Sequence, residues 1–303
     1  MARLVRISTT SLLVAEQPSY PSACIEEAFK AVETAGERGS DLMVLPEEFD
    51  VVGGDEKAAP EPHGICEPIP GGPITSRMQE LARRYEMYIV SDVRELDGGR
   101  KFNTAVVIGR DGEIVGTYRK THLAPSEERD VLPGDELPVF DLDFGKIGII
   151  ICMDVHYPEI CTLYALKGAD IICWPTMSRD YTGDCMEVVM KARAFDNQVY
   201  FVRSSFISMP FLTGVSMGRG CVIDPYGRIL ADTSHKPGVA TVTVDLDEGF
   251  EYWLEGEDKL RWPTVKETLL GMRRPELYAA LSQPDTEQLW KIKNPKLFKP
   301  GTA

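Results

Sequence analysis

Short apolar runs alternate along the chain with longer segments in which apolar residues recur every three or four positions. The longer segments have the period of a helix packed on one face. They predict helices over Pro21 to Arg38, Ile74 to Tyr85, Pro158 to Lys167 and Met186 to Asn197. The short runs have the length of buried strands. They predict strands over Leu4 to Thr10, Asp41 to Leu45, Met87 to Asp92, Val139 to Phe144, Ile147 to Met153, Asp170 to Trp174, Val199 to Ser205 and Val239 to Leu246.

Two further pairs of strands are predicted to form hairpins. Phe102 to Gly109 and Glu113 to Tyr118 flank a turn that contains Asp111-Gly112, and Asp-Gly between apolar runs is a strong hairpin signal. A second pair, Gly220 to Ile223 and Arg228 to Thr233, flanks the turn Asp224-Pro225-Tyr226-Gly227. Helices that alternate with buried strands indicate the α/β class, with parallel strands covered by helices.

The regular pattern ends near residue 250 and contains no internal linker. We therefore predict one domain over residues 1–250 and a C-terminal extension over residues 251–303. The extension carries three tryptophans, Trp253, Trp262 and Trp290, among scattered prolines. Because this segment is too short to build a core easily, we expect it to pack on the domain or across a subunit interface.

Charge and hydropathy exclude several classes of protein. The net charge is −14 and no basic run is present, which argues against a nucleic-acid or anionic-membrane partner. No apolar run approaches the roughly 20 residues that span a bilayer. The first residues lack the apolar core and cleavage site of a signal peptide, so we expect a cytoplasmic protein.

The seven cysteines are odd in number and show no C-x-x-C spacing. This pattern argues against a disulfide framework, a zinc knuckle and a thiol oxidoreductase. Reduced thiols are expected. Cys152 differs from the others because it closes an apolar run and precedes a polar turn. A lone cysteine is most often a buried apolar residue, but a thiol at a strand end can be a nucleophile, with the Met153 N–H exposed to hold an oxyanion.

Two other polar residues follow predicted strands in the same way. Glu47 and Glu48 come directly after the strand that ends at Leu45, and a carboxylate beside apolar walls can serve as a general base. Lys120 follows the strand that ends at Tyr118, and its ammonium can stabilise negative charge on a reacting carbonyl. Taken alone, a glutamate or a lysine at such a position is also typical of a solvent-exposed loop. Together, however, the three types of side chain meet the needs of thiolate attack on an amide.

Four segments in this order resemble the motifs of the nitrilase, or carbon–nitrogen hydrolase, superfamily. They are Leu45-Pro46-Glu47-Glu48-Phe49, Tyr118-Arg119-Lys120-Thr121-His122-Leu123, Glu127-Glu128-Arg129-Asp130-Val131-Leu132-Pro133-Gly134 and Gly148-Ile149-Ile150-Ile151-Cys152-Met153-Asp154 with Tyr157-Pro158-Glu159. The resemblance extends over residues 3–247, through Phe102-Asn103-Thr104-Ala105, Arg193 to Tyr200 and Asp224 to Gly227.

The resemblance implies a fold and a set of roles. The fold would be a four-layer α-β-β-α sandwich that forms a homodimer, or a larger even-numbered oligomer, through its outer helices. Position within the motifs selects Glu47 over Glu48, and Glu127 over Glu128, to act with Lys120 and Cys152. Neither a metal nor an organic cofactor is implied.

The residues after the cysteine bear on the substrate. Nitrilases of the superfamily usually carry Cys-Trp-Glu, whereas Met153-Asp154 here resembles the amidase and carbamoylase branches. Those branches often place an arginine shortly after the cysteine to hold a substrate carboxylate, and this chain has Val155 and His156 there. His156 could replace that arginine in part, although a lone histidine is more often packed or exposed to solvent. We also expect contacts to substrate from Tyr157, and Arg129 and Arg179 are candidate partners of an anionic group.

We therefore predict a hydrolase that cleaves a small aliphatic amide or an N-carbamoyl amine through a cysteine thioester. The alternatives are a nitrilase acting on a small nitrile and a catalytically silent binding protein of the same fold. Loss of Glu47, Lys120 or Cys152 would favour the silent protein, and all three are present.

Overall fold

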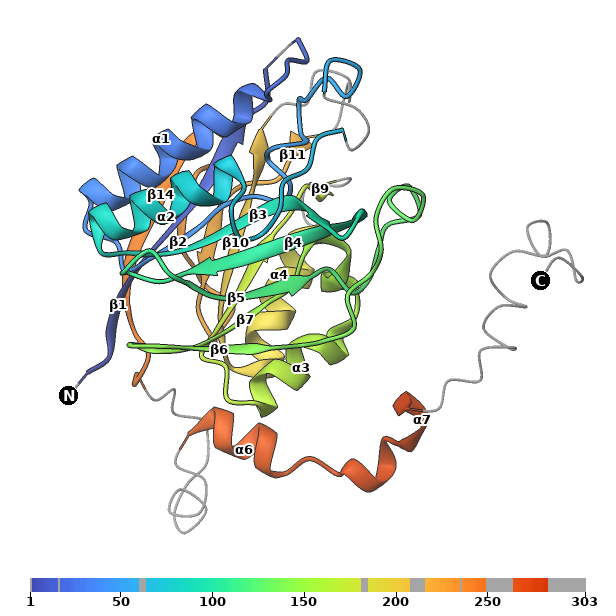
Figure 1. Cartoon of the computed structure of the whole chain (residues 1–303). Helices are drawn as coiled ribbons and strands as arrows, with labels where there is room; N and C mark the ends of the chain where they lie inside the picture. The colour runs from blue at the N-terminus through green and yellow to red at the C-terminus, as the bar shows by residue number, and fades with distance from the viewer. Residues whose placement is uncertain are drawn as a thin grey trace, which may run out of the picture.

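The computed structural model describes residues 2–15, 17–59, 64–180, 185–207, 216–234, 236–248 and 264–282, with the backbone alone for residues 179–180, 185 and 216–217. Strands and helices in this part of the chain form layers, with the strands between two pairs of helices (Figure 1). The predicted alternation of helices and strands is confirmed.

Twelve strands in the described ranges form one continuous sheet that folds into two facing halves. The first half contains β1 (Leu4–Leu13), β2 (Leu42–Val44), β3 (Tyr88–Asp97), β4 (Arg100–Ile108), β5 (Ile114–Arg119) and β14 (Gly238–Asp245). The halves are joined where residues 11–13 of β1 pair in parallel with residues 205–207 of β10.

The second half repeats the arrangement of the first. It contains β6 (Val139–Leu142), β7 (Gly145–Ile149), β8 (Ile171–Pro175), β10 (Tyr200–Ile207), β12 (Cys221–Ile223) and β13 (Ile229–Asp232). Each half has three parallel strands at its centre, β3-β2-β1 in the first and β10-β8-β7 in the second. A separate two-stranded ladder pairs β9 (Arg179–Asp180) with β11 (Ser216–Met217).

Helices cover the outer face of each half. Helices α1 (Ala23–Glu37) and α2 (Pro73–Tyr85) pack on the first half, and α3 (Pro158–Leu166) and α4 (Cys185–Asn197) pack on the second. A third apolar cluster fills the space between the halves, with Val5, Ile7 and Val44 from one side and Ile149, Ile171 and Val202 from the other. The predicted four-layer α-β-β-α sandwich is therefore confirmed.

The strand predicted over Ile147 to Met153 ends earlier than expected. Strand β7 stops at Ile149, and a 3-10 turn, η1 (Cys152–His156), begins at the cysteine. Cys152 takes a left-handed backbone conformation, with φ of 42°. Such a conformation is uncommon for a residue with a side chain, and it turns the chain sharply out of the sheet.

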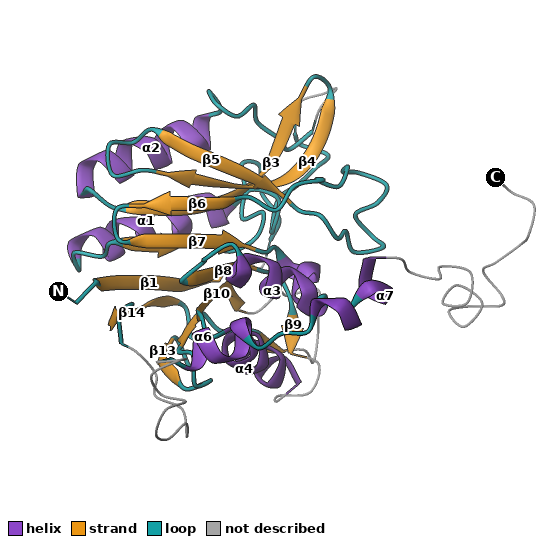
Figure 2. Cartoon of the chain, turned by 90° about the horizontal axis from the view of Figure 1, so that it is seen from below, coloured by secondary structure: helices purple, strands orange, loops and turns teal. Residues whose placement is uncertain are grey.

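Residues after the last strand include α6 (Val265–Gly271), η2 (Pro275–Leu277) and α7 (Ala279–Ser282). Helix α6 lies against α4 (Figure 2). Val265 is buried, and the Lys266 ammonium donates to the Ala169 carbonyl oxygen at 2.8 Å. Trp253, Trp262 and Trp290 fall outside the described residues, so the expected packing of the tryptophan segment stays a prediction.

No helix within the described ranges is long and apolar enough to cross a membrane. The expected cytoplasmic location stays a prediction.

Candidate active site

The three residues singled out in the sequence lie at the same edge of the folded sheet. Glu47 follows β2 and Lys120 follows β5, both in the first half, while Cys152 follows β7 in the second half. The parallel strands end at this edge, which is where open α/β sheets bind ligands. The site is therefore assembled from loops of both halves.

Lys120 stands between two carboxylates. Its ammonium nitrogen donates to Glu47 Oε1 at 2.7 Å and to both carboxylate oxygens of Glu127 at 2.7 and 2.8 Å. The Lys120 side chain is 1% exposed. Glu47, rather than Glu48, and Glu127, rather than Glu128, reach the ammonium, and Glu128 is exposed. Two carboxylates around one ammonium leave one negative charge in a buried place.

Asn103 belongs to this cluster, although the sequence reasoning did not select it. Its amide nitrogen donates to Glu47 Oε1 at 3.0 Å and to Glu127 Oε1 at 3.3 Å. Its backbone oxygen also accepts a hydrogen bond from the Lys120 N–H at 2.9 Å. The buried Asn103 side chain thus fixes both carboxylates relative to the lysine. The Phe-Asn-Thr-Ala segment was the signal that could have identified it.

The cysteine turn is held by neighbours on β8 and in the loop that follows it. The indole N–H of Trp174 donates to the Cys152 carbonyl oxygen at 3.1 Å, and the Cys152 sulfur lies 3.7 Å from the Ser178 hydroxyl. The backbone N–H of Met177 donates to Glu47 Oε2 at 2.8 Å, so the same loop contacts the carboxylate and the thiol. This loop joins the two halves of the site.

Electrostatics keep the thiol protonated in the resting site. Burial, with the neighbouring Glu47 carboxylate, raises the pKa of Cys152 to about 12, against the opposing effect of Lys120. Burial also raises the pKa of Glu47, and Glu127 adds to the rise while Lys120 opposes it. Burial lowers the pKa of Lys120, but Glu47, Cys152 and Glu127 more than reverse this and hold the pKa well above its usual value. A protonated thiol thus lies beside a carboxylate with increased proton affinity.

Asp154 ties the cysteine turn to the segment that carries Lys120. One carboxylate oxygen accepts from the Ile151 N–H at 2.9 Å and from the Tyr118 hydroxyl at 2.6 Å. The other accepts from the Thr121 hydroxyl at 3.1 Å and from the His122 N–H at 2.9 Å. Because Asp154 is fully buried, this network fixes the distance between the two loops.

The remaining predicted residues lie around the cysteine turn. Met153 is half-buried in η1, and His156 is exposed at its end. Tyr157 stacks on His122, with ring centroids 3.8 Å apart. Arg129 is exposed on its loop. The backbone of Arg179 lies in β9, but its side chain falls outside the described part of the chain. Contacts of these residues with substrate stay predictions.

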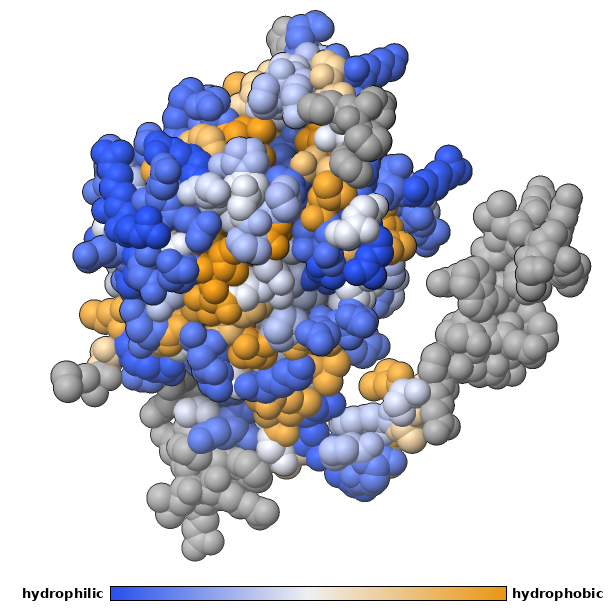
Figure 3. All heavy atoms as spheres, viewed as in Figure 1, coloured by the Kyte–Doolittle hydropathy of each residue, from blue (hydrophilic) through white to orange (hydrophobic). Residues whose placement is uncertain are grey.

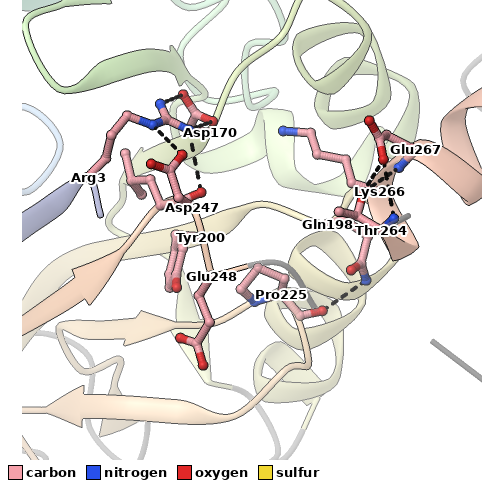
Figure 4. Close-up of a pocket in the computed structure, with 11 residues that line it drawn as sticks. Arg3, Asp170, Gln198, Tyr200, Pro225, Asp247, Glu248, Thr264, Lys266 and Glu267 are labelled. Carbon is pink, nitrogen blue, oxygen red and sulfur yellow. Dashed lines mark hydrogen bonds and ion pairs between the residues drawn. The ribbon is translucent and has the colours of Figure 1, made fainter. Parts of the chain in front are cut away.

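A second charged region lies at the opposite edge of the sheet and contains none of the predicted site residues. This cavity, of about 360 Å³, is lined by Arg3, Asp170 and Asp247 near strand ends and by Lys266 of α6 (Figure 4). Arg3 pairs with Asp170 at 3.2 Å and with Asp247 at 2.7 Å. The cavity is therefore remote from Cys152, because it lies where the parallel strands begin.

No group of three or more side chains suited to a metal ion occurs among the described residues.

Comparison with known proteins places the chain in a family. The model of the carbon–nitrogen hydrolase family matches residues 12–252. An omega-amidase of Xenopus tropicalis is 30% identical over 253 residues, which cover 80% of this chain and 89% of that protein. A nitrilase of Pyrococcus abyssi is 34% identical over 232 residues, which cover 75% and 86% of the two chains.

Solved structures agree on the fold. The crystal structure of Nit3 of Saccharomyces cerevisiae, a member of the nitrilase superfamily, superposes with a TM-score of 0.73 at 23% identity, covering 88% of this chain and 96% of that one. An amidase from Nesterenkonia sp. gives a TM-score of 0.72 at 21% identity, with 91% and 96% covered. The chain belongs to the carbon–nitrogen hydrolase family, within the nitrilase superfamily, and it is a hydrolase of carbon–nitrogen bonds.

Proposed function

We propose that the chain hydrolyses small neutral amides, with Cys152 as the nucleophile, Glu47 as the general base and Lys120 as the cation that stabilises the oxyanion. One observation carries the proposal: the Cys152 thiol and the Lys120 ammonium, from different halves of the sheet, both lie against the Glu47 carboxylate. Glu127 and Asn103 hold this arrangement from the far side of the lysine. A half-buried thiol with a raised pKa needs such a base to become a nucleophile.

The first half of the reaction makes a thioester. Glu47 takes the thiol proton as the Cys152 sulfur attacks the amide carbon, and the carbonyl oxygen gains the negative charge. The Lys120 ammonium and the Met153 N–H stabilise that oxygen. The tetrahedral species collapses as the C–N bond breaks, and the proton on Glu47 passes to the leaving nitrogen. Ammonia or an amine departs, and the acyl group stays on the sulfur.

The second half returns the enzyme to its starting state. Glu47 takes a proton from a water molecule, whose oxygen attacks the thioester carbon, and the same two donors stabilise the second oxyanion. The C–S bond then breaks, the carboxylic acid leaves, and the proton on Glu47 returns to the Cys152 sulfur. No oxidant, metal or organic cofactor takes part in these steps.

Several observations support an amide as the substrate. The relatives include omega-amidases, and the Nesterenkonia amidase has been crystallised as a mutant in complex with acrylamide and as another with the acetamide moiety of fluoroacetamide bound covalently to its active-site cysteine. Met153-Asp154 after the cysteine also resembles the amidase and carbamoylase branches. An N-carbamoyl amine presents the same kind of carbonyl and is the second substrate class that we propose. Because one relative is named a nitrilase, nitriles are included among the substrates to be tested.

Ammonia release across matched substrates tests the proposal. We expect turnover of propionamide and butyramide, weaker turnover of N-carbamoyl amines, and little turnover of the corresponding nitriles. Cys152→Ala supplies the background rate for every compound. Nitrile turnover above amide turnover would replace the amidase assignment with the nitrilase one. Turnover at the background rate for all three classes would support a silent binding protein.

Charge recognition forms a separate part of the proposal. Because His156 and Arg129 are both exposed, and Val155 is buried, we expect no strong binding of a substrate carboxylate near the cysteine. The ratio of kcat/KM for a neutral amide to that for an N-carbamoyl amino acid of similar size should exceed one. A preference for the carboxylate-bearing compound that Arg179→Ala or Arg129→Ala abolishes would contradict this.

We also propose that the enzyme is a homodimer or a larger even-numbered homo-oligomer. Apolar side chains are exposed on α3 and on the segment after α6 (Figure 3), among them Leu163, Leu166, Leu277 and Leu281. An apolar surface of this kind favours association. Analytical ultracentrifugation should give a dimer or higher species at micromolar concentration, whereas a monomer would contradict the proposal.

A further inference from the structure

A second cavity lies on the outer side of the sheet, between the beginnings of α1 and α2, which point toward the same end of the molecule (Figure 1). Its volume is about 380 Å³, which is within the range of small-molecule sites. Apolar side chains form much of its wall, in particular Ile25, Phe29, Ile65 and Ile74. None of Glu47, Lys120, Cys152 and Glu127 lines this cavity, so it is distinct from the candidate active site.

Asp50 lines the same cavity and is 1% exposed. Its Oδ2 accepts a hydrogen bond from the Arg94 N–H at 3.0 Å, but its Oδ1 has no hydrogen-bond partner in the described structure. A buried carboxylate oxygen without a partner is unfavourable, and native proteins rarely keep one without a reason. This oxygen is therefore an acceptor that a ligand could satisfy.

Two other buried acidic groups near the cavity wall, Glu67 and Glu48, are already engaged. Glu67 accepts from the Ile74 and Thr75 N–H groups at 2.8 Å each, and so satisfies the start of α2. Glu48, which neighbours Asp50, accepts two hydrogen bonds from Arg94. Among the buried carboxylates that line this cavity, Asp50 is thus the one with unused hydrogen-bonding capacity, whereas Glu26 is exposed to solvent.

The charges at the rim favour a cation over an anion. Glu26 and Glu67 line the cavity together with Asp50, against one cationic residue, Arg77. The Arg77 guanidinium is bound to Glu80 at 2.8 Å and to Glu33 at 3.6 Å, which partly neutralises it. A ligand with N–H donors, a positive charge and an apolar body would match both the acceptor and the walls.

We propose that this cavity binds a small primary ammonium ion with an apolar body, whose N–H groups donate to Asp50 Oδ1. The apolar body lies against Ile25, Phe29, Ile65 and Ile74. The site does not depend on the proposed amidase chemistry, because its walls and its acceptor are separate from the cysteine turn.

The affinity of the site should depend on pH. Burial and the neighbouring Glu48 raise the pKa of Asp50 to about 7, with a further contribution from Glu67 and an opposing one from Arg94. Glu26, Cys66 and Arg77 are the other charged or titratable groups that line the cavity. The carboxylate forms as the pH rises through about 7, while a primary alkylammonium stays protonated to about pH 10. Binding should therefore strengthen between pH 6 and pH 8, in the range over which Asp50 ionises.

Titration calorimetry of the full-length protein at pH 8 tests the site, with benzylammonium as the probe and benzyl alcohol as the uncharged match. We expect benzylammonium to bind the wild type and the Cys152→Ala variant equally, and more tightly than benzyl alcohol. Asp50→Asn should weaken benzylammonium binding about tenfold or more, in line with the loss of a charge-assisted hydrogen bond. Asp141→Asn makes the same charge change at an exposed position and should have no effect.

A second variant blocks the cavity without touching Asp50. Ala23 is exposed on the cavity wall, so Ala23→Trp should fill the cavity and abolish binding while the fold, measured by circular dichroism, is kept. This variant decides the question alone if Asp50→Asn does not fold. Absent binding by the wild type, unchanged affinity in a folded Asp50→Asn or Ala23→Trp variant, or binding lost in Cys152→Ala would each overturn the proposal.

Discussion

Glu47 and Glu48 are adjacent in the chain, yet they belong to two ionic clusters with different chemistry. Glu47 shares the Lys120 ammonium with Glu127 and contacts the Cys152 thiol, and we call this group the lysine cluster. Glu48 accepts from Arg94 Nε at 2.8 Å and from Arg94 Nη2 at 2.9 Å, and we call these two residues the arginine pair. Glu47, Lys120, Glu48 and Arg94 are all buried.

The difference between them lies in how the charge is matched. In the arginine pair, a planar guanidinium meets the buried Glu48 carboxylate through two parallel hydrogen bonds, so these two charges cancel, and the exposed Glu56 carboxylate lies 3.9 Å from the guanidinium. In the lysine cluster, one ammonium faces two carboxylates; burial raises the pKa of Glu47, and the Glu127 charge adds to the rise while Lys120 opposes it. The first arrangement holds the chain in place, whereas the second leaves a carboxylate able to accept a proton. These two neighbouring glutamates therefore differ in their chemistry because their charged partners differ.

The largest expected effect is on the thiol beside the lysine cluster. Cys152→Ala should lower kcat by several orders of magnitude, because it removes the proposed nucleophile. The assay is ammonia release from a small amide, with circular dichroism to verify the fold. Cys66→Ala, a change at a half-buried thiol outside the cluster, is the matched control and should keep kcat. Near-wild-type turnover by Cys152→Ala would remove the basis of the proposed mechanism.

The second-largest effect is expected from the cation of the lysine cluster. Lys120→Met keeps the length of the side chain and removes the charge, so kcat should fall by about a hundredfold or more. Lys146→Met is the matched change at an exposed lysine, paired with Asp141, and should leave kcat unchanged. An unaltered kcat in Lys120→Met would place Lys120 outside the reacting site.

The arginine pair should show the opposite behaviour. Arg94→Met leaves the Glu48 carboxylate buried without its partner, which typically costs about 3–5 kcal/mol of unfolding free energy. Urea unfolding measures the loss, and the kcat per folded molecule should fall far less than in Lys120→Met. The comparison fails if Arg94→Met unfolds at the wild-type urea concentration, or if it loses activity while fully folded.

The smallest effect concerns pH. Glu47 must be ionised to accept the thiol proton, and its raised pKa means that kcat/KM is lost as the pH falls through a value above the ordinary 4.5 of a glutamate. Glu127→Gln removes a neighbouring negative charge and should shift this acid limb to lower pH. Because the pKa of Lys120 is raised, its deprotonation should not limit activity at alkaline pH. An acid limb that stays at the same pH in Glu127→Gln would show that another group controls it.

The residues of the lysine cluster could be predicted from the sequence, because their positions follow from local sequence patterns. Strand-length apolar runs located Glu47, Lys120 and Cys152 at strand ends, and the motif resemblance selected Glu47 and Glu127 from each acidic pair. The arginine pair was not predicted, because Glu48 and Arg94 are 46 residues apart and neither position has a distinctive local pattern. Long-range side-chain pairing depends on the register of the strands, which the spacing of apolar residues does not give.

The geometry of the cysteine turn could not be predicted from the pattern of apolar residues either. Continuous apolar residues favoured a strand through Met153, and nothing in that run indicated a left-handed residue at Cys152. The hydrogen bonds that Asp154 accepts from the Lys120 segment stabilise the turn, and they join residues from different halves of the sheet. Asn103 was missed for the same reason, since its carboxylate partner Glu47 lies 56 residues away.

The pairing of β1 has a consequence for how the chain is made. This first strand lies beside β2 on one side, while β14 pairs with it from Leu4↔Asp245 to Ser11↔Gly238 and β10 joins it at residues 11–13. On the ribosome, β1 therefore emerges long before its last partner has been translated. Until then, one edge of the strand offers unpaired backbone groups to any neighbouring nascent chain. Synthesis that stops before β14 would leave that edge open, and we therefore expect such truncated chains to aggregate more readily than the full-length chain.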